Sequence, residues 1–472
     1  MTRPKVYVLH ALREDSRATT INHTACFGRY MIGCNVEYIN IFGKIPTQTD
    51  SDMVIVTYEL IGLRNLPIWN ILRQRMAPFL RNTKVRVLMP QDDYSRSDVL
   101  DEFAASEEFQ FVFSPITRDL RQLYPKSMER GVAFHEAYTG YFEQSDWARL
   151  QQFSKPFSER AIDVGQRVRY LPPQLGERAG KKGLLAIKFA QVTSEAGFVC
   201  DVSTKSEDVF VGDEWWKFLG NTKFTVSRRG GASMADPTGR LADKVRRYQF
   251  RHPEVKIEEL SQRLSFKGGR EGDFSAISPR LFEAAAMGVC QILEPDQYVD
   301  GLKPWVHYLP LLEDFSNIEE VLDAMRDDDR CSEIVKASQE ILLHNNYFTY
   351  SAFVERLCKV TKLEQNIELG SSFSDSSDLY DACISDQDGS LAWVQGYVER
   401  SFLKRKLTSA IESLRVGKFL LLDEKDSAWA DHAVTHSESL ILWLNSFKSR
   451  ELLIESYVIP WRSMSSFVTK EN

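Results

Sequence analysis

The chain lacks the features that mark several large classes of protein. No run of about 18 apolar residues occurs, so no segment is predicted to cross a membrane as a helix. The 7 cysteines are scattered and form no C-x-x-C, which favours free thiols in a reducing compartment over a disulfide framework. Neither a Walker A motif nor G-x-G-x-x-G is present, and we find no internal repeat.

What is present is ordinary for a globular protein. Of 472 residues, 43% are apolar and 26% are charged, and the length suits two or three domains. The net charge of -7 disfavours a general nucleic-acid-binding protein, which would carry a basic surface. The first residues, M-T-R-P-K-V-Y-V-L-H, read as a strand, so we expect no signal peptide and a cytoplasmic location. Peripheral contact with the inner face of a membrane stays open, because a local basic patch would suffice.

Strand and helix patterns alternate along residues 1–155, the first predicted domain. The predicted strands are Lys5–Leu9, Val36–Phe42, Met53–Tyr58, Lys84–Met89 and Phe109–Phe113. The helical patterns between them are Thr20–Ile32, Leu66–Leu80 and Arg118–Tyr124. Short apolar strands separated by helices predict a parallel, doubly wound sheet, as in Rossmann-like domains.

A second alternating set spans residues 156–364 and ends in closing helices. The predicted strands are Ala161–Val164, Phe198–Val202, Asp208–Gly212, Thr222–Ser227 and Val289–Leu293. The predicted helices are Lys182–Ala196, Asp243–His252, Ile257–Leu264, Ile318–Met325, Ser332–Leu343 and Ser351–Val360. Two consecutive Rossmann-like α/β domains predict a cleft between them, with ligands at the carboxyl ends of the strands.

The composition changes after the second domain. Residues 365–390 are rich in Ser and Asp and read as a linker. Residues 391–472 read as a mainly helical C-terminal extension, whose role the sequence does not indicate. A protein partner for this extension stays open.

The segment Ser275–Glu294 predicts a loop, a sharply started helix and a buried strand. Ser278 is suited to cap the helix, and Pro279 falls at its first position. Glu283 is two residues past the capping-box position, so it has no capping role. A helix start beside Arg280 suits a phosphate, and a nearby carboxylate can accept from two sugar hydroxyls. These residues indicate a nucleotide-sugar site; the alternative is a surface helix with solvated charges.

Further candidates for donor binding come from the same domain. Gly230, Gly231 and Ser233 follow a predicted strand in V-S-R-R-G-G-A-S, where backbone amides can hold a phosphate; a plain turn is the alternative. Arg167 and Lys182 can together neutralise a diphosphate leaving group, or else be two solvated cations. His307 can reach a donor phosphate or be structural.

Candidate catalytic residues come from the first domain. Asp92 and Asp93 follow the apolar strand V-R-V-L-M, so one carboxylate can take a proton from an acceptor hydroxyl while the other orients it. A helix cap by Asp or by Ser95 is the alternative. His23, on the first predicted helix, can serve as base or acceptor contact, or be a packed histidine.

No metal site is predicted. His432 and His436 have helical metal spacing but lack the glutamate of H-E-x-x-H and a third ligand. Two D-x-D strings, at 327–329 and 386–388, do not follow core strands and read as solvated charge. We therefore expect a metal-independent reaction with no cofactor.

The motifs G-G-A-S-M-A-D-P-T-G, I-S-P-R-L-F-E-A-A-A-M-G-V-C-Q-I-L and H-Y-L-P-L-L-E-D-F-S-N carry a resemblance, which T-T-I-N-H-T and L-M-P-Q-D-D-Y support in the first domain. Over residues 1–355 the chain resembles the two-domain GT-B glycosyltransferases, in particular bacterial "glycosyltransferase family 1" proteins related to spore-maturation-protein-like enzymes. The resemblance implies a nucleotide-diphosphate-sugar donor on the second domain and an acceptor on the first. It implies that Glu283 binds the ribose, that Arg280 and Ser278 lie near the diphosphate, and that Arg167 and Lys182 neutralise the leaving group.

Two departures from the family pattern are visible. The Glu-x7-Glu pair of many GT-B enzymes is incomplete, because its earlier position is Ser275, and Arg167 and Lys182 are spaced more widely than in better-known families. The implied function is transfer of a sugar, as in hexosyltransferases, to a hydroxyl of a glycan or glycolipid precursor in cell-surface polysaccharide synthesis. Direct deprotonation by Asp92 or Asp93 predicts inversion at the anomeric carbon. A nucleotide-sugar epimerase and a non-catalytic nucleotide- or glycan-binding protein are the alternatives.

Overall fold

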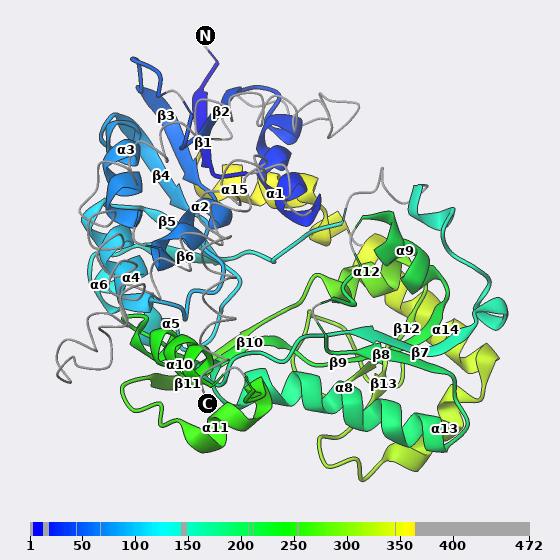
Figure 1. Ribbon diagram of the computed structural model, residues 1–472. Helices are drawn as coiled ribbons and strands as arrows, with labels where there is room; N and C mark the ends of the chain where they lie inside the picture. Colours follow the sequence, from blue (N-terminus) through cyan, green and yellow to red (C-terminus); the bar gives the residue numbers. More distant parts are fainter. Residues whose placement is uncertain are drawn as a thin grey trace, which may run out of the picture.

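The computed structural model of the chain describes residues 3–363, except 13–17, 44, 67, 143–148, 206, 211, 253 and 345. The predicted linker, the predicted C-terminal extension and the two histidines His432 and His436 lie outside the described residues. Within the described part, two α/β domains are joined by an arm and by a final helix that returns to the first domain (Figure 1). No helix of this part is long and apolar enough to cross a bilayer.

The first domain is built on one sheet of six strands in the order β2-β1-β3-β4-β5-β6, and every pairing in it is parallel. The strands are β1 (Lys5–His10), β2 (Asn35–Asn40), β3 (Ser51–Val56), β4 (Thr83–Leu88), β5 (Phe111–Ser114) and β6 (Ala133–Glu136). The helices are α1 (Ala18–Tyr30), α2 (Tyr58–Gly62), η1 (Leu63–Asn65), α3 (Trp69–Arg81), α4 (Ser97–Ser106), α5 (Leu120–Leu123) and α6 (Pro125–Glu129).

The central strands of this sheet are buried on both faces. In β1, Val6 and Val8 pack into one apolar cluster, while Tyr7 and Leu9 pack into another on the opposite face. Because side chains alternate along a strand, an almost continuous apolar run is what a sheet covered by helices on both sides requires. The residues that follow these strands, at the carboxyl edge of the sheet, include the cleft residues described below.

The second domain contains a five-stranded sheet in the order β13-β12-β9-β7-β8, again with parallel pairings. The strands are β7 (Ile162–Arg167), β8 (Cys200–Ser203), β9 (Thr222–Ser227), β12 (Cys290–Leu293) and β13 (Leu309–Pro310). The helices are η2 (Phe157–Glu159), η3 (Pro173–Leu175), α8 (Glu177–Glu195), α9 (Asp213–Gly220), α12 (Arg280–Ala286), α13 (Ile318–Met325), α14 (Asp328–Gln339), η5 (Glu340–His344) and η6 (Asn346–Phe348). This is a doubly wound order whose switch point lies between β7 and β9. The prediction of two Rossmann-like α/β domains is confirmed.

Residues 230–276 form a separate arm that bridges the two domains (Figure 1). The arm pairs β10 (Gly230–Ala235) with β11 (Arg270–Ala276) in antiparallel fashion, with α10 (Arg240–Arg251), η4 (Ile257–Glu259) and α11 (Leu260–Arg263) between them. The backbone amide of Asp236 donates to the carbonyl oxygen of Tyr94 over 2.7 Å, and Phe274 packs into the core of the first domain. The arm is therefore inserted between strands of the second domain along the chain, but it packs against the first domain.

Two sequence predictions fail here. The Gly-rich turn predicted at Gly230 and Gly231 is wrong, because these residues begin β10 and pair with Ala276 and Ser275. The strand predicted at Asp208–Gly212 is also wrong for the described residues of that range, which are turn and irregular structure before α9.

The last described helix, α15 (Tyr350–Val360), returns to the first domain and packs against α1 (Figure 1). Phe353 of α15 lies beside Phe27 and His23 of α1, with ring centroids 6.3 and 5.6 Å away. The two domains thus share one apolar core at this side of the molecule.

Candidate functional site

A cleft of about 690 Å³ lies between the two domains. From the first domain it is lined by residues that directly follow strands β1, β3, β4 and β5: Ala11, Tyr58, Glu59, Gln91, Asp92, Pro115 and Ile116. From the other side it is lined by Lys182 of α8, Gly230 and Gly231 of the arm, and Ser278. The carboxyl ends of parallel strands are where open α/β sheets bind ligands, so the cleft lies where the sequence predicts it.

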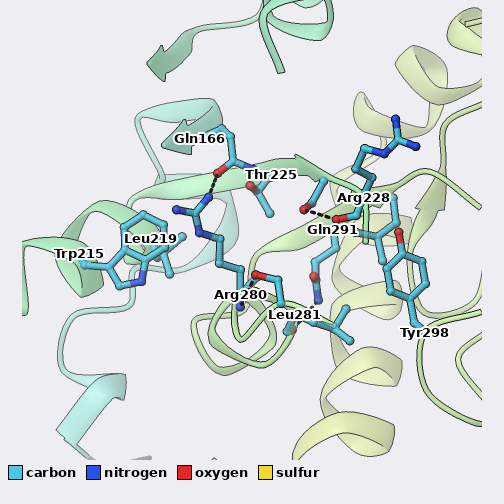
Figure 2. A pocket seen from close by; sticks show the side chains of 13 residues that line it. Gln166, Trp215, Leu219, Thr225, Arg228, Arg280, Leu281, Gln291 and Tyr298 are labelled. Carbon is cyan, nitrogen blue, oxygen red and sulfur yellow. Dashed lines mark hydrogen bonds between the residues drawn. The ribbon is translucent and has the colours of Figure 1, made fainter. Parts of the chain in front are cut away.

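A smaller cavity of about 20 Å³ adjoins the cleft in the second domain. It lies at the carboxyl ends of β7, β9 and β12, and Ser278 lines both spaces. Figure 2 shows the side chains around it, with Arg280 pointing toward Gln166 and Trp215 beside it. The polar residues of this cavity therefore lie next to the cleft, on the second-domain side.

Lys182 is the charged residue that the second domain contributes to the lining of the cleft. Within the described chain, its Nζ has neither an ion-pair nor a hydrogen-bond partner, and a Cβ added at Gly230 of the arm would lie 3.9 Å from it. Burial, together with the positive charges of Arg280 and Arg228, lowers the pKa of Lys182 to about 7. An ammonium among cations is suited to receive an anion.

Arg280 begins helix α12 and holds its guanidinium at the edge of the site. Its Nη1 donates to Oε1 of Gln166 over 3.1 Å, and its guanidinium lies 5.4 Å from the ring centre of Trp215 (Figure 2). The hydroxyl of Ser278 accepts from the Arg280 amide at 3.4 Å, while Pro279 occupies the N-cap position. The helix therefore begins one residue later than predicted, and Ser278 contacts its first turn.

Asp92 is the predicted catalytic residue that lines the cleft. Its backbone is in the left-handed region, with φ 53°, which is uncommon for a residue with a side chain. Its Oδ1 accepts a hydrogen bond of 2.5 Å from the hydroxyl of Tyr94, which also lines the cleft. The strained turn thus presents a carboxylate to the space between the domains.

The side chain of Asp93, unlike that of Asp92, points away from the cleft. Its side chain is fully buried and accepts hydrogen bonds from Ser114 Oγ at 2.6 Å and from the hydroxyl of Tyr124 at 2.5 Å. Burial raises the pKa of this carboxyl group. The catalytic role predicted for Asp93 is therefore corrected: the residue is a polar contact of the first-domain core.

The two predicted histidines also lie away from the cleft. His23 is 2% exposed among the rings of Tyr58, Tyr141, Tyr350 and Phe353, and burial lowers its pKa to about 4. His23 is packed between α1 and α15 and lines neither the cleft nor the smaller cavity, so it is not placed to deprotonate an acceptor hydroxyl. His307 accepts a hydrogen bond at Nδ1 from the amide of Lys303 over 2.8 Å, and it lines neither cavity.

Arg167 lines neither the cleft nor the smaller cavity, so the structure does not support its predicted contact with the leaving group. Its guanidinium donates to the carbonyl oxygen of Asp208 at 3.0 Å, and to the carbonyl oxygen and carboxylate of Asp201 at 2.8 Å each. Side chains alternate along β7, so Gln166 reaches the smaller cavity while Arg167 packs on the other face of the sheet.

Ser233 and Glu283, two further predicted donor-binding residues, make contacts within the protein. Ser233 Oγ accepts from the backbone amide of Arg178 at 3.2 Å, which holds the first turn of α8 against the arm. Glu283 accepts a hydrogen bond of 3.1 Å from the indole of Trp215 and lines a separate cavity of about 80 Å³. Neither side chain lines the interdomain cleft. The ribose contact implied for Glu283 stays a prediction.

Glu59 is a cleft residue that sequence reasoning missed. Its Oε1 accepts from Thr57 Oγ1 at 2.5 Å and from Thr24 Oγ1 at 3.2 Å, and burial raises its pKa to about 7. The signal was present, because T-Y-E-L follows the apolar strand M-V-I-V just as P-Q-D-D follows V-R-V-L-M.

No group of three or more His, Cys, Asp or Glu side chains in the described part of the chain could hold a metal ion.

The chain matches no family model and no curated protein sequence. Among solved structures it is similar to HepE from Anabaena in complex with UDP-glucose, at 10% identity and a TM-score of 0.41, over 76% of this chain and 100% of that chain. It is similar to a glycosyltransferase from Rickettsia africae at 9% identity and a TM-score of 0.34, over 77% and 100% of the two chains. It is also similar to sucrose-phosphate synthase from Thermosynechococcus elongatus, at 10% identity and a TM-score of 0.36, over 76% and 99%.

None of these comparisons tests the resemblance to the spore-maturation-protein-like group, which stays a prediction. At such low identities and TM-scores, we base the function of the chain on its own cleft.

Proposed function

We propose that the chain is a glycosyltransferase that moves a sugar from a nucleotide-diphosphate donor to a hydroxyl of a glycan or glycolipid acceptor. The observation that carries this proposal is the charge arrangement of the cleft. Lys182 lies on the second-domain side without a counterion among the described residues, and the carboxylate of Asp92 lies on the first-domain side. One side suits an anionic leaving group, and the other suits a hydroxyl that must lose a proton.

The donor diphosphate is assigned to the cationic side. Lys182 and Arg280 can stabilise the negative charge that develops as the bond between the sugar and the diphosphate breaks. Each charge-assisted hydrogen bond is worth about 1.5–3 kcal/mol, which supports a role of both residues in donor affinity and in leaving-group departure. The reaction is proposed to need no metal ion.

The acceptor is assigned to the first-domain side, which offers the hydroxyls of Thr19, Thr20 and Tyr58 next to the two carboxylates Glu59 and Asp92. As the acceptor oxygen bonds to the anomeric carbon, its proton passes to Asp92 and the bond from that carbon to the diphosphate breaks. A base that acts directly on the attacking hydroxyl implies inversion at the anomeric carbon. Retention of configuration in the product would contradict this assignment.

The first experiment measures thermal stabilisation by UDP-glucose, ADP-glucose, GDP-glucose and dTDP-glucose, which differ only in the nucleoside. A ligand at 100 times its dissociation constant adds about 2.7 kcal/mol to the free energy of unfolding. We expect one of the four to stabilise the wild type and to lose most of this effect in Lys182→Gln. If none of the four stabilises the wild type, the donor assignment fails.

Lys181→Gln is the matched control for this experiment. It removes the same charge from the same helix, but Lys181 points to Glu177 and Glu313 rather than into the cleft. An equal loss of donor binding in Lys181→Gln would mean that the effect is one of net charge. Conversion of the donor sugar without release of the nucleoside diphosphate would instead favour an epimerase.

A further inference from the structure

Two adjacent lysines of helix α8 have opposite surroundings. Lys181 pairs with Glu177 at 2.7 Å and with Glu313 at 2.5 Å, and these contacts raise its pKa. Lys182 turns toward the cleft, where it lines the cavity beside Gly230 and meets no carboxylate partner among the described residues. The charge of Lys181 is therefore neutralised by two carboxylates, whereas that of Lys182 is neutralised by none among the described residues.

The charges around Lys182 come from several elements. Arg280 of α12 and Arg228, which follows β9, both disfavour its ammonium form. Arg228 is itself paired with Glu294 at 3.1 Å, so that carboxylate is already engaged by another cation. On its own helix, Arg178 pairs with Asp273 and Asp296. Asp92 and Glu59 line the first-domain side of the same cleft.

This grouping has an excess of positive charge in a partly desolvated space. Lys182, Arg280 and Arg228 lie close together in the second domain, and Glu294 is paired with Arg228. The guanidinium groups stay protonated under all ordinary conditions, whereas an ammonium can relieve the repulsion by losing its proton. Burial drives the pKa of Lys182 in the same direction.

We propose that Lys182, which lines the cleft without a counterion among the described residues, takes up a proton from solvent when the donor diphosphate binds. The lone pair of Nζ accepts this proton, and the resulting ammonium pairs with the diphosphate oxygens. Donor binding is then coupled to proton uptake. The ammonium formed on donor binding stabilises the diphosphate as it leaves. The inference rests on the proposed function, because it requires the diphosphate to lie beside Lys182.

The sign of the pH dependence follows from linkage. A bound dianion favours the charged form of Lys182, so the donor-bound protein holds its proton to higher pH than the empty protein does. With a pKa of about 7 in the empty cleft, the donor affinity is maximal below pH 7 and declines above it. Between pH 6.5 and 8.5 the expected fall in affinity is about 20-fold, since each pH unit above the free pKa costs up to tenfold.

The test is calorimetric titration of the wild type with the four glucose nucleotides named above, at pH 6.5, 7.5 and 8.5. These donors are diphosphate diesters, which lack the second phosphate ionisation near pH 6, so the ligand does not titrate in this range. At pH 8.5, titrations in HEPES and in Tris are compared, because these buffers release protons with different enthalpies. We expect a difference that corresponds to nearly one proton taken up per donor bound.

Lys182→Arg is the decisive variant, because a guanidinium keeps its charge throughout this range. It is expected to bind the donor with an affinity that varies less than threefold between pH 6.5 and 8.5, and to take up no proton. Lys181→Arg, the matched control, is expected to retain the wild-type pH dependence. Thermal melts of both variants establish that they are folded, and the proton count on the wild type does not depend on either of them.

The outcomes separate the two proposals. If no glucose nucleotide binds at any pH, the proposed function and this inference both fail. If one binds with an affinity that is independent of pH and without proton uptake, the donor site stands and the inference is overturned. The same holds if Lys182→Arg keeps the full pH dependence, since another group would then be the one that titrates.

Discussion

The guanidinium of Arg64 donates from Nη2 to the carbonyl oxygen of Asp92 over 2.7 Å. Arg64 is 1% exposed, and its other donors reach the carbonyl oxygens of Ile61 at 3.1 Å and Ser95 at 3.0 Å. One buried side chain therefore fixes the end of α2, the helix that carries Glu59, and the turn that carries Asp92. Both carboxylates of the cleft are therefore positioned from the core through the backbone, since Arg64 bonds the main chain around them rather than the carboxylates.

The first prediction concerns Asp92 and separates its backbone from its carboxylate. Asparagine tolerates the left-handed conformation, so Asp92→Asn is expected to change the free energy of unfolding by less than about 0.5 kcal/mol. Loss of the base is expected to lower the rate of sugar transfer at least about 100-fold while donor affinity is retained. Denaturant unfolding, donor titration and turnover are measured on the same preparation.

Asp92→Val is the comparison variant, since a β-branched residue at this φ adds strain of about 1–3 kcal/mol. Turnover of Asp92→Asn within a factor of three of the wild type would show that Asp92 is not the proton acceptor. Glu59, the other carboxylate of the cleft, would then be the residue to examine.

The second prediction concerns the pH dependence of stability through Glu59. Its pKa is about 7 in the folded chain, above the usual 4.5, so the folded state holds a proton that the unfolded state has lost between these values. Stability from this group is therefore full below about pH 4.5, falls as the pH rises to 7, and is constant above. Glu59→Gln removes the dependence.

The free energy of unfolding of Glu59→Gln, relative to the wild type, is expected to increase by about 1–2 kcal/mol from pH 5 to pH 8. This figure is below the full linkage value, because solvent in the cleft screens the carboxylate. Taking the difference at each pH cancels all other titrating groups. A difference that is constant across this range, or that changes in the opposite direction, would contradict a raised pKa for Glu59.

Much of the fold could be predicted because its central strands are buried on both faces. Strands β1, β3 and β4 and helix α13 read clearly as apolar runs or periodic patterns, and the sequence of β9 predicts its bounds, Thr222–Ser227, as the structure has them. Strand β6 was missed because it is a short edge strand, A-F-H-E, with little apolar character. Strand β10 was missed because glycine and small residues signal a turn, and only pairing with β11 makes them a strand.

For the site, the sequence predicted some of the residues that follow strands at the carboxyl edge of the sheets. Asp92 and Ser278 line the cleft because they follow strands β4 and β11. Lys182 lines it from the second turn of α8, which begins five residues before the predicted start at Lys182. The wrong predictions concern positions next to cleft-lining residues. Asp93 is buried in the core, and Arg167 lies on the face of β7 opposite Gln166. Alternation along a strand shows that neighbouring side chains point to opposite faces, but not which face lines the site. His23 is covered by α15, which lies more than 300 residues further along the chain, a contact that no local pattern encodes.

The third prediction compares two adjacent glycines of the arm. A Cβ at Gly231 would lie 2.2 Å from the carbonyl oxygen of Phe274, and the residue has φ 87°. Gly231→Ala therefore is expected to force β10 away from β11 and to lower the free energy of unfolding by at least about 2 kcal/mol. At Gly230 the nearest atom would be 3.5 Å away, so Gly230→Ala is expected to cost less than about 1 kcal/mol.

Denaturant unfolding of the two variants is the measurement. Equal stability of the two would show that the close pairing of β10 and β11 is not required for folding. Gly230→Ala also serves as a probe of the cleft, because its added methyl group would lie 3.9 Å from Nζ of Lys182.

The last prediction separates the two arginines that the sequence assigned to the donor. Arg167 is 7% exposed and its donors are taken up by Asp201 and Asp208, so Arg167→Met is expected to lower the free energy of unfolding by about 2–4 kcal/mol. Its folded fraction is expected to bind the donor as the wild type does. Arg280→Met lies in the site, and it is expected to weaken donor binding by about 10- to 100-fold, with a smaller loss of stability than Arg167→Met.

Thermal melts and donor titrations on both variants give the four values needed. The opposite pattern, with Arg167→Met folded but unable to bind and Arg280→Met binding normally, would place the diphosphate on the other face of β7. That face is occupied by the rings of Phe210 and Phe218, 4.7 and 4.4 Å from the Arg167 guanidinium, so the donor would have to displace an aromatic contact. On the other face of β7, Gln166 lines the smaller cavity beside Arg280, so a donor bound there would displace no such contact.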